Sequence, residues 1–210
     1  MLTRLKQVSP QILIKASPMI DLKAGIAELE SVNRVIVLSI DNEVKEVLFH
    51  LDFTNDKNVS IRCVNIKNDK IDLFNYAYFG ALQEEIIISQ LKAYLYEPNA
   101  AILKAGAQDA LAKQKNLTKL HRNTNLFTND QLINDFPGRV FKTIADLPYN
   151  KKEISSHIRV KKANLSTRNF IDTPEQMKRK LGLQDGGNIY LFGYRNFENR
   201  NKVVICEKVN

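Results

Sequence analysis

Short apolar runs separated by helical patterns are the feature that most constrains the fold of this chain. Residues 34–40 (Arg-Val-Ile-Val-Leu-Ser-Ile) are β-branched and nearly continuous, which is typical of a strand buried on both faces of a parallel sheet. Residues 11–15 and 59–66 also have strand-like patterns. Apolar residues at helical spacing predict helices over 21–29 and 42–51. The order strand–helix–strand–helix–strand indicates α/β architecture.

The rest of the chain predicts two small α+β segments. Thr173, Pro174 and Glu175 have the residue types of a helix start, and Lys178-Arg179-Lys180 complements the dipole at the end of that helix. We therefore divide the chain into residues 1–75, 76–147 and 148–210. The expected elements are a strand at 92–96, a helix at 100–113, strands at 123–128 and 140–144, a helix at 151–158, an extended segment at 162–170, the helix begun by Thr173, and a hairpin of 189–194 with 202–209.

Positive charge is concentrated in the last third of the chain. The 210 residues include 31 Lys and Arg and 23 Asp and Glu, a formal net charge of +8. Residues 1–75 are neutral overall and residues 76–140 contribute +1, whereas residues 141–210 hold fourteen basic and seven acidic residues, a net charge of +7. A localised basic excess is an electrostatic footprint for a polyanion, and a solvated surface explains the same charge equally well.

Aromatic residues interleave with these basic residues. Basic and aromatic side chains on a small α+β unit suit RNA, through phosphate contacts and base stacking. The alternative is that the strand aromatics form the core. The aromatic residues are Phe170, Tyr190, Phe192, Tyr194 and Phe197. The candidates for nucleic-acid contact are Lys161, Lys162, Arg168, Lys178, Arg179, Lys180 and Arg195, with Arg200 and Lys202 framing the hairpin tip.

Several other classes of protein do not fit the sequence. No GxGxxG or GxxxxGK motif is present, so the chain shows no nucleotide-binding loop of its own. The three histidines are scattered, and Cys63 and Cys206 are far apart without a CxxC motif. We therefore expect no metal site or disulfide scaffold, two small core cysteines and a reducing cytoplasm. No apolar run approaches the roughly 20 residues that span a bilayer, so no membrane partner is expected.

Six segments, taken in order along the chain, resemble a bacterial class I S-adenosylmethionine-dependent methyltransferase family. Segments 14–21 (Ile-Lys-Ala-Ser-Pro-Met-Ile-Asp) and 42–46 (Asn-Glu-Val-Lys-Glu) are similar to the later part of that family's methyltransferase domain. The resemblance continues through its ferredoxin-like middle segment at 96–106 and 135–139, and its C-terminal THUMP-like domain at 167–170 and 183–187. The implied fold is the tail of a Rossmann-like methyltransferase sheet, followed by ferredoxin-like and THUMP-like α+β domains.

The resemblance covers only the C-terminal part of the proteins of that family. Its members have a complete methyltransferase core upstream, with a glycine-containing cofactor loop and a catalytic Asp-Pro-type motif, and this sequence contains neither. We therefore expect residues 1–75 to be an incomplete methyltransferase fold in a truncated chain. The resemblance implies S-adenosylmethionine as the cofactor of the complete family protein. We expect none to bind this chain alone, because the family's cofactor-binding residues have no counterparts here.

The ends of the first two predicted strands hold the candidates for a catalytic rim. Ligands of open α/β sheets bind beyond the carboxyl ends of the strands. This rule selects Lys15 and Ser17 at the end of the first strand, and Asn42 and Glu43 after the second. Lys15 suits a phosphate or substrate group, whereas Ser17 before Pro18 is explained equally well as a structural turn.

These observations favour one function and leave two alternatives open. The leading hypothesis is the C-terminal, substrate-recognition part of a methyltransferase that acts on structured RNA, either tRNA or rRNA. The first alternative is a non-catalytic RNA-binding or interaction module, which needs no cofactor loop. The second is a methyltransferase with a non-RNA substrate, because a fold-level resemblance does not determine the substrate.

Overall fold

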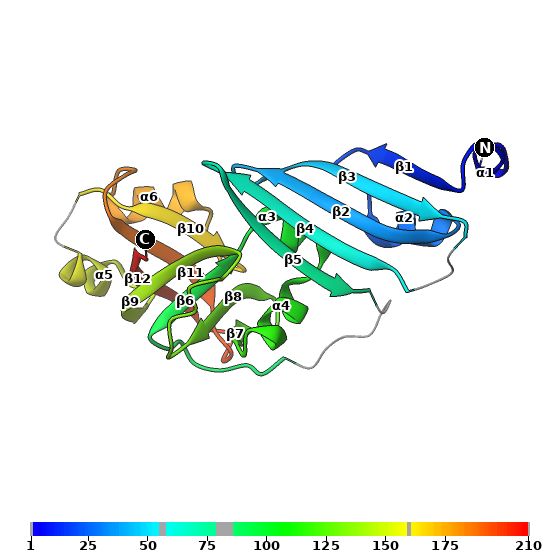
Figure 1. The fold of residues 1–210 in the computed structure, drawn as a ribbon. Helices are drawn as coiled ribbons and strands as arrows, with labels where there is room; N and C mark the ends of the chain where they lie inside the picture. The colour runs from blue at the N-terminus through cyan, green and yellow to red at the C-terminus, as the bar shows by residue number, and fades with distance from the viewer. Residues whose placement is uncertain (1, 55–57, 79–85, 159–160, 210) are drawn as a thin grey trace. The chain divides into compact units, whose positions relative to one another are not determined.

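The computed structural model describes residues 2–54, 58–78, 86–158 and 161–209. These residues belong to two compact units: an N-terminal unit of residues 1–85 and 99–111, and a C-terminal unit of residues 86–98 and 112–210. The elements, labelled in Figure 1, are α1 (Leu2–Val8), β1 (Gln11–Ala16), α2 (Leu22–Glu28), β2 (Val32–Ile40), β3 (Glu43–Asp52), β4 (Ser60–Lys67), β5 (Lys70–Ala77), β6 (Tyr94–Pro98), α3 (Ala100–Ala105), α4 (Gln108–Gln114), β7 (Thr118–His121), β8 (Thr124–Asn129), β9 (Gly138–Pro148), α5 (Lys151–His157), β10 (Asn164–Arg168), α6 (Pro174–Leu181), β11 (Ile189–Arg195) and β12 (Asn201–Lys208).

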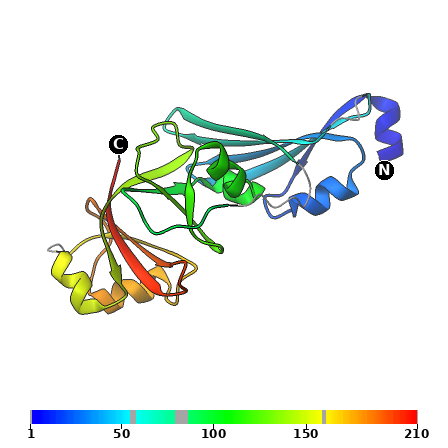
Figure 2. The same cartoon turned by 90° about the horizontal axis from the view of Figure 1, so that it is seen from below.

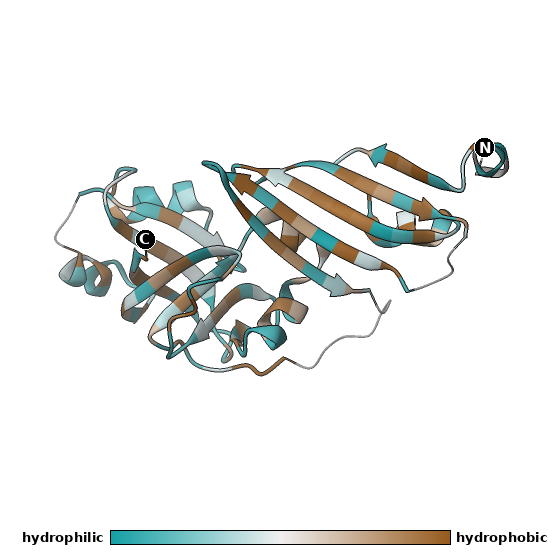
Figure 3. Cartoon of the chain, in the orientation of Figure 1, coloured by the Kyte–Doolittle hydropathy of each residue, from teal (hydrophilic) through white to brown (hydrophobic). Residues whose placement is uncertain are grey.

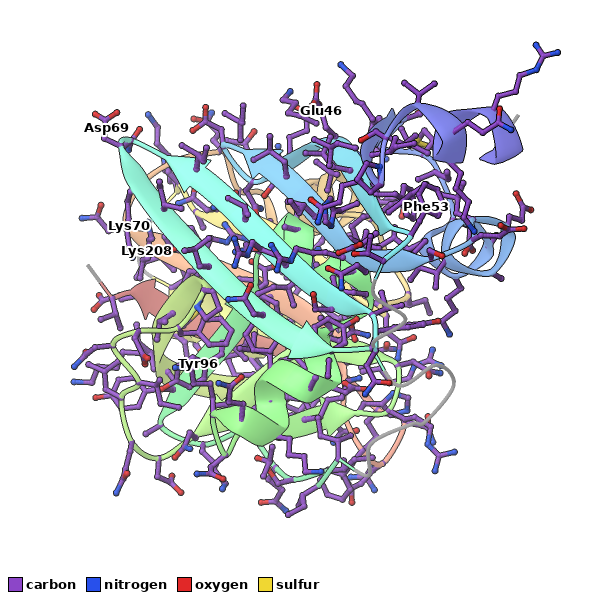
Figure 4. The ribbon with its side chains drawn as sticks, turned by 45° about the vertical axis from the view of Figure 1, so that its right-hand side comes forward. Glu46, Phe53, Asp69, Lys70, Tyr96 and Lys208 are labelled. Atoms are coloured by element: carbon purple, nitrogen blue, oxygen red, sulfur yellow. The ribbon has the colours of Figure 1, made fainter. Side chains whose placement is uncertain are left out.

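The N-terminal unit is built on a five-stranded sheet of order β1-β3-β2-β4-β5 (Figure 1). Strand β3 pairs antiparallel with both β1 and β2, so β1 and β2 run in the same direction, and α2 lies between them in the chain. Strands β2 and β4 are parallel, and β4 and β5 form a hairpin whose turn contains Asp69 (Figure 4). The sheet is therefore mixed.

Helices α2 and α3 cover one face of this sheet (Figure 2). Gly25 lets α2 approach closely, because a Cβ atom there would lie only 2.6 Å from Cζ of Phe49. Helix α3 packs against β2, β3 and β4. Figure 3 shows apolar residues along the strands of this sheet. The side chains that form the buried face of the strands include Val35, Val37, Val47, Phe49, Leu51, Ile61 and Cys63.

The helix predicted over residues 42–51 is wrong, because this segment is strand β3. Asp41 and Asn42 have positive φ angles of 51° and 64° and form the tight turn of a β2–β3 hairpin. The buried residues alternate along β3 with the period of a strand, and the strand has hydrogen-bonding partners on both sides. Strand β2 is likewise buried on alternate residues rather than on both faces. The Rossmann-like tail is not confirmed.

The C-terminal unit contains one continuous seven-stranded sheet of order β10-β11-β12-β9-β6-β8-β7. Strand β9 joins its two parts, because it pairs with β6 on one side and β12 on the other. One apolar cluster packs on α5 and α6 and includes Ile154, Met177, Leu191 and Val203. A second cluster contains Leu95, Leu120, Leu126, Phe141, Phe192, Tyr194, Val204 and Cys206.

Most of the elements predicted for this region are confirmed, including the helix after Thr173 and the hairpin of β11 with β12. The helix predicted over 100–113 is instead two helices, α3 and α4. Gly106 separates them, since its φ of 67° belongs to the left-handed conformation that ends a helix. The predicted domain boundary after residue 75 falls inside β5, and the boundary after residue 147 falls at the end of β9.

Candidate nucleic-acid interface

Helix α6 carries three basic residues, and local signals determine where the helix begins and ends. Oγ1 of Thr173 accepts a hydrogen bond from the backbone N–H of Gln176, and Oε1 of Gln176 accepts one from the N–H of Thr173. This reciprocal capping box begins the helix, and Gly182, with a φ of 73°, ends it. Met177 and Leu181 are buried, so the apolar side of the helix faces the core. The basic residues in the last turn are Lys178, Arg179 and Lys180.

Two of these three cations pair with carboxylates of the same unit. Lys178 forms an ion pair with Asp185. Nζ of Lys180 lies 2.7 Å from Oδ2 of Asp172, and the Tyr149 hydroxyl donates a hydrogen bond of 2.6 Å to the same oxygen. Hydrogen bonds from Lys180 and then from Tyr149 lower the pKa of Asp172. Burial, followed by the hydrogen bond to Asp172, raises the pKa of Tyr149. The side chain of Arg179 is exposed.

Lys161 and Lys162 contact the short segment that residues of α6 also contact. The carbonyl of Lys161 accepts a hydrogen bond of 2.9 Å from the N–H of Gln184, and Lys162 forms a parallel bridge with the same glutamine. Lys178 contacts Asp185, the next residue. Both lysines at 161 and 162 are exposed. Lys161 and Lys162 thus lie beside the segment that Lys178 contacts, and Arg179 follows Lys178 in α6. We name these four residues the basic patch: Lys161, Lys162, Lys178 and Arg179.

Arg168 has a partner in the protein interior. The Glu97 side chain is only 3% exposed, and it pairs with the guanidinium groups of both Arg168 and Arg139. The Arg139 guanidinium also lies 5.5 Å from the ring centroid of Phe141. These contacts connect β6, β9 and β10 in one unit. Arg168 therefore stabilises the sheet, and with 36% of its side chain exposed it contributes to the surface potential as well.

A loop held by hydrogen bonds to one side chain follows β11. Oδ1 of Asn196, which is 7% exposed, accepts hydrogen bonds from the N–H groups of Glu198 (3.1 Å) and Arg200 (2.9 Å). The loop holds Phe197 outward with 41% of its surface exposed. Arg195, at the start of the loop, is half-buried, and its carbonyl accepts a hydrogen bond from Thr124. Arg195 is therefore less accessible than the basic patch.

A cavity of about 170 Å³ opens beside this loop. Asp146 lies in its wall, where it accepts a hydrogen bond of 2.9 Å from the Tyr194 hydroxyl and pairs with Lys202. Burial, followed by the charge of Asp146, raises the pKa of Tyr194. The sequence offers no signal for this cluster, because Asp146 is 48 positions from Tyr194 and 56 from Lys202. The lining residues are Ser89, Gln90, Leu91, Leu120, Asp146, Tyr194, Asn196, Phe197, Glu198 and Lys202.

Most aromatic residues of this region belong to the core. Phe192 and Tyr194 are almost fully buried, and the ring centroids of Tyr190 and Phe141 are 5.0 Å apart. Phe170 packs against Tyr149 at 4.8 Å. The alternative of core packing is therefore correct for Phe192 and Tyr194, whereas Phe197 remains exposed to solvent.

Each of the four rim candidates in the N-terminal unit contacts a group of the same unit. Nζ of Lys15 pairs with Glu46 at 2.8 Å, and Glu43 pairs with Lys45 at 2.7 Å. Oγ of Ser17 accepts a hydrogen bond from the N–H of Met19, so Ser17 forms part of a turn. Oδ1 of Asn42 accepts one from the N–H of Ala100, at the start of α3. Each of these side chains thus has a local structural contact.

The two cysteines and the potential metal ligands offer no reactive group or metal site among the described residues. Burial raises the pKa of the Cys63 thiol to about 12 and also raises that of Cys206, as expected of core cysteines. Among the residues that the structure describes, no three His, Cys, Asp or Glu side chains gather as metal ligands. No helix in those same ranges has both the length and the apolar character needed to cross a membrane.

Comparison with known proteins identifies two domain types in this chain. Residues 94–137 match the family described as a ferredoxin-like domain, and residues 138–208 match the family described as THUMP domain-like. These two segments hold the shared seven-stranded sheet, since β6 belongs to the first and β9 to β12 belong to the second. The chain therefore contains a ferredoxin-like domain and a THUMP-like domain.

One solved structure extends the similarity to nearly the whole chain. It is a crystal structure described as "putative methyltransferase from Porphyromonas gingivalis W83", with a TM-score of 0.92 and 28% sequence identity. The match covers 99% of this chain and 53% of that one, so this chain spans about half the length of its relative. The comparison with curated proteins found no match.

Proposed function

We propose that this chain is the RNA-recognition part of an S-adenosylmethionine-dependent methyltransferase. The basic patch carries the proposal, because it lies on a domain of the THUMP-like type, which is associated with RNA binding. Four basic side chains around one surface segment suit the phosphates of structured RNA. We expect a tRNA or an rRNA as partner, in the cytoplasm.

The N-terminal unit supports the methyltransferase part of the proposal. Strands β1 and β2 run in the same direction, α2 connects them, and β3 is inserted between them. This strand–helix–strand connection supports the interpretation of residues 1–75 as the last part of a class I, Rossmann-like methyltransferase sheet. The structural relative, described as a methyltransferase, supports the same interpretation.

The rim residues of this unit do not fit S-adenosylmethionine. Lys15 and Glu43 are held in ion pairs, Ser17 in a turn and Asn42 at the start of α3. None of these contacts forms a cradle of backbone N–H groups. We therefore assign recognition, and no step of methyl transfer, to the residues of this chain. We expect no heat of S-adenosylmethionine binding to the chain alone in titration calorimetry, and micromolar binding would contradict this assignment.

Salt dependence tests phosphate-driven binding directly. Fluorescence anisotropy of a labelled tRNA should show affinity falling steeply as salt rises from about 50 to 200 mM, because each neutralised phosphate releases a counterion. Binding that does not weaken over this range would exclude a phosphate-driven interface.

Charge-matched variants test the location of the interface. Lys161→Ala with Arg179→Ala removes two exposed cations of the basic patch, and should reduce the slope of log affinity against log salt by about 1–2. Lys67→Ala with Lys70→Ala removes two exposed cations near the β4–β5 turn of the other unit and serves as the control. Equal losses in both variants would show general electrostatic attraction rather than a patch.

A non-catalytic RNA-binding module is the second candidate. The structural contacts of all four rim residues favour it, because this function requires neither a cofactor nor a reactive side chain. The two functions differ when the chain is mixed with the upstream half of a related methyltransferase. Restored methyl transfer to RNA supports the first candidate, whereas RNA binding without any restored activity supports the second.

A further inference from the structure

We propose that the cavity beside Phe197 binds a single unstacked RNA nucleobase, preferentially one that carries an amino group. This inference rests on the proposed RNA-binding function and adds a base-recognition site separate from the basic patch. All lining residues belong to the C-terminal unit, so one compact body forms the whole site.

The size of the cavity limits its occupant. Its volume of about 170 Å³ corresponds to about six water molecules in the liquid. Pockets for drug-sized ligands are about 300–1,000 Å³, so a whole nucleotide cofactor is too large. A single planar ring system is of the right scale, and a pyrimidine fits better than a purine.

The largely polar wall also includes two leucines and one exposed aromatic ring. Leu91 and Leu120 supply apolar contacts, and Phe197 at the mouth is 41% exposed. The loop that carries Phe197 is held by hydrogen bonds to the buried Asn196 side chain. An exposed aromatic ring beside a cavity is suited to stacking an unpaired base, and the hydrogen bonds that hold its loop lower the entropy cost of binding.

The polar part of the wall is rich in hydrogen-bond acceptors. Asp146 uses one oxygen for the Tyr194 hydroxyl and the other for Lys202, and a carboxylate has about four lone-pair sites. Glu198 supplies a second carboxylate at the same cavity. Carboxylates accept hydrogen bonds from the exocyclic amine of cytosine and repel the carbonyl oxygen that uracil has at that position. The wall therefore favours cytosine over uracil.

Positive charge at the loop suits the phosphates that flank such a base. The Arg200 side chain is 75% exposed and lies 3.6 Å from Glu198. Lys202 is 23% exposed in the cavity wall. A base can enter the cavity while its backbone stays at the surface near Arg200.

Three single-stranded probes separate base recognition from phosphate binding: oligo(rC), oligo(rU) and an abasic ribose-phosphate chain of the same length. The wild-type chain should bind oligo(rC) about fivefold or more tightly than the abasic chain, with oligo(rU) between them. Phe197→Ala should abolish this preference, and Phe197→Tyr should retain it. Ile171→Ala, at a residue 65% exposed in the same unit, is the matched control and should keep the wild-type preference.

A spectroscopic variant gives a second readout. The sequence contains no Trp, so Phe197→Trp introduces a single tryptophan at the cavity. Its fluorescence should be quenched by oligo(rC) and remain almost unchanged with the abasic chain. Thermal unfolding of each variant is measured alongside, and it should stay close to that of the wild type, because Ile171 is 65% and Phe197 is 41% exposed.

The results distinguish failure of this inference from failure of the proposed function. Salt-dependent binding of tRNA, with equal affinity for oligo(rC) and the abasic chain, would overturn the base site alone. An unchanged preference in Phe197→Ala would do the same. If no RNA binds at about 50 mM salt, both the base site and the RNA-recognition function are overturned.

Discussion

Glu97→Gln is the substitution expected to destabilise the C-terminal unit most clearly. The Glu97 carboxylate is 3% exposed and pairs with Arg139, whose Nε donates to it at 2.6 Å, and with Arg168. The amide keeps the shape of the side chain and removes its charge. The guanidinium groups of Arg139 and Arg168 would then lose the counter-charge that they share.

The size of the effect follows from burial. Removing one partner of a fully buried ion pair costs about 3–5 kcal/mol. The Arg139 and Arg168 side chains are 34% and 36% exposed, so water screens part of the repulsion that remains. We therefore expect a loss of about 2–3 kcal/mol in the free energy of unfolding, or about 8–13 °C in Tm for a unit of this size.

Urea unfolding, followed by circular dichroism, measures this loss as a lower midpoint at an unchanged m value. Glu43→Gln is the control, because its side chain is 74% exposed and pairs only with Lys45 among the described contacts. That variant should stay within about 0.5 kcal/mol of the wild type. If Glu97→Gln is equally neutral, the three-residue ion cluster does not stabilise the sheet and the reasoning is refuted.

Three further predictions follow from packing and protonation. Gly25→Ala should lower the free energy of unfolding by about 1–3 kcal/mol in a urea titration, because its Cβ would lie 2.6 Å from the buried Phe49 ring, and an unchanged midpoint would contradict this. The pKa of Asp172 is lowered in the folded state, chiefly by Lys180, so its contribution is present at neutral pH and lost as pH falls below about 4. The stability difference between wild type and Asp172→Asn should shrink on acidification, and a constant difference would count against this linkage. Burial raises the pKa of Cys63 to about 12, so its thiol should react with a thiol reagent at pH 8 only after denaturation.

Elements defined by local signals were predictable from the sequence. The Thr173 cap, Pro174 in the first turn and Gly182 after the last turn lie within ten residues, and α6 forms between them as expected. The β11–β12 hairpin was predictable for the same reason, since alternating apolar runs flank one polar loop. Local backbone preferences decide such elements before any long-range contact forms.

Strand β3 shows where local patterns fail. Val44, Val47, Leu48 and Leu51 have helical spacing, and the same segment also buries Val47, Phe49 and Leu51 as a strand. The choice depended on the hydrogen-bonding edges of β1 and β2, which lie on either side of β3. Tertiary pairing overrides a helical pattern when both neighbouring edges are available.

The sequence by itself determined that the basic excess lies in residues 141–210, that the two cysteines are core residues and that the region after residue 150 is a small α+β segment. Only the tertiary structure decided which charges remain at the surface. Arg168 meets Glu97 across 71 positions, and Lys202 meets Asp146 across 56. The same folding left Lys161, Lys162 and Arg179 exposed. Composition counts charges along the chain, whereas pairing depends on distances that exist only after the strands have been brought together.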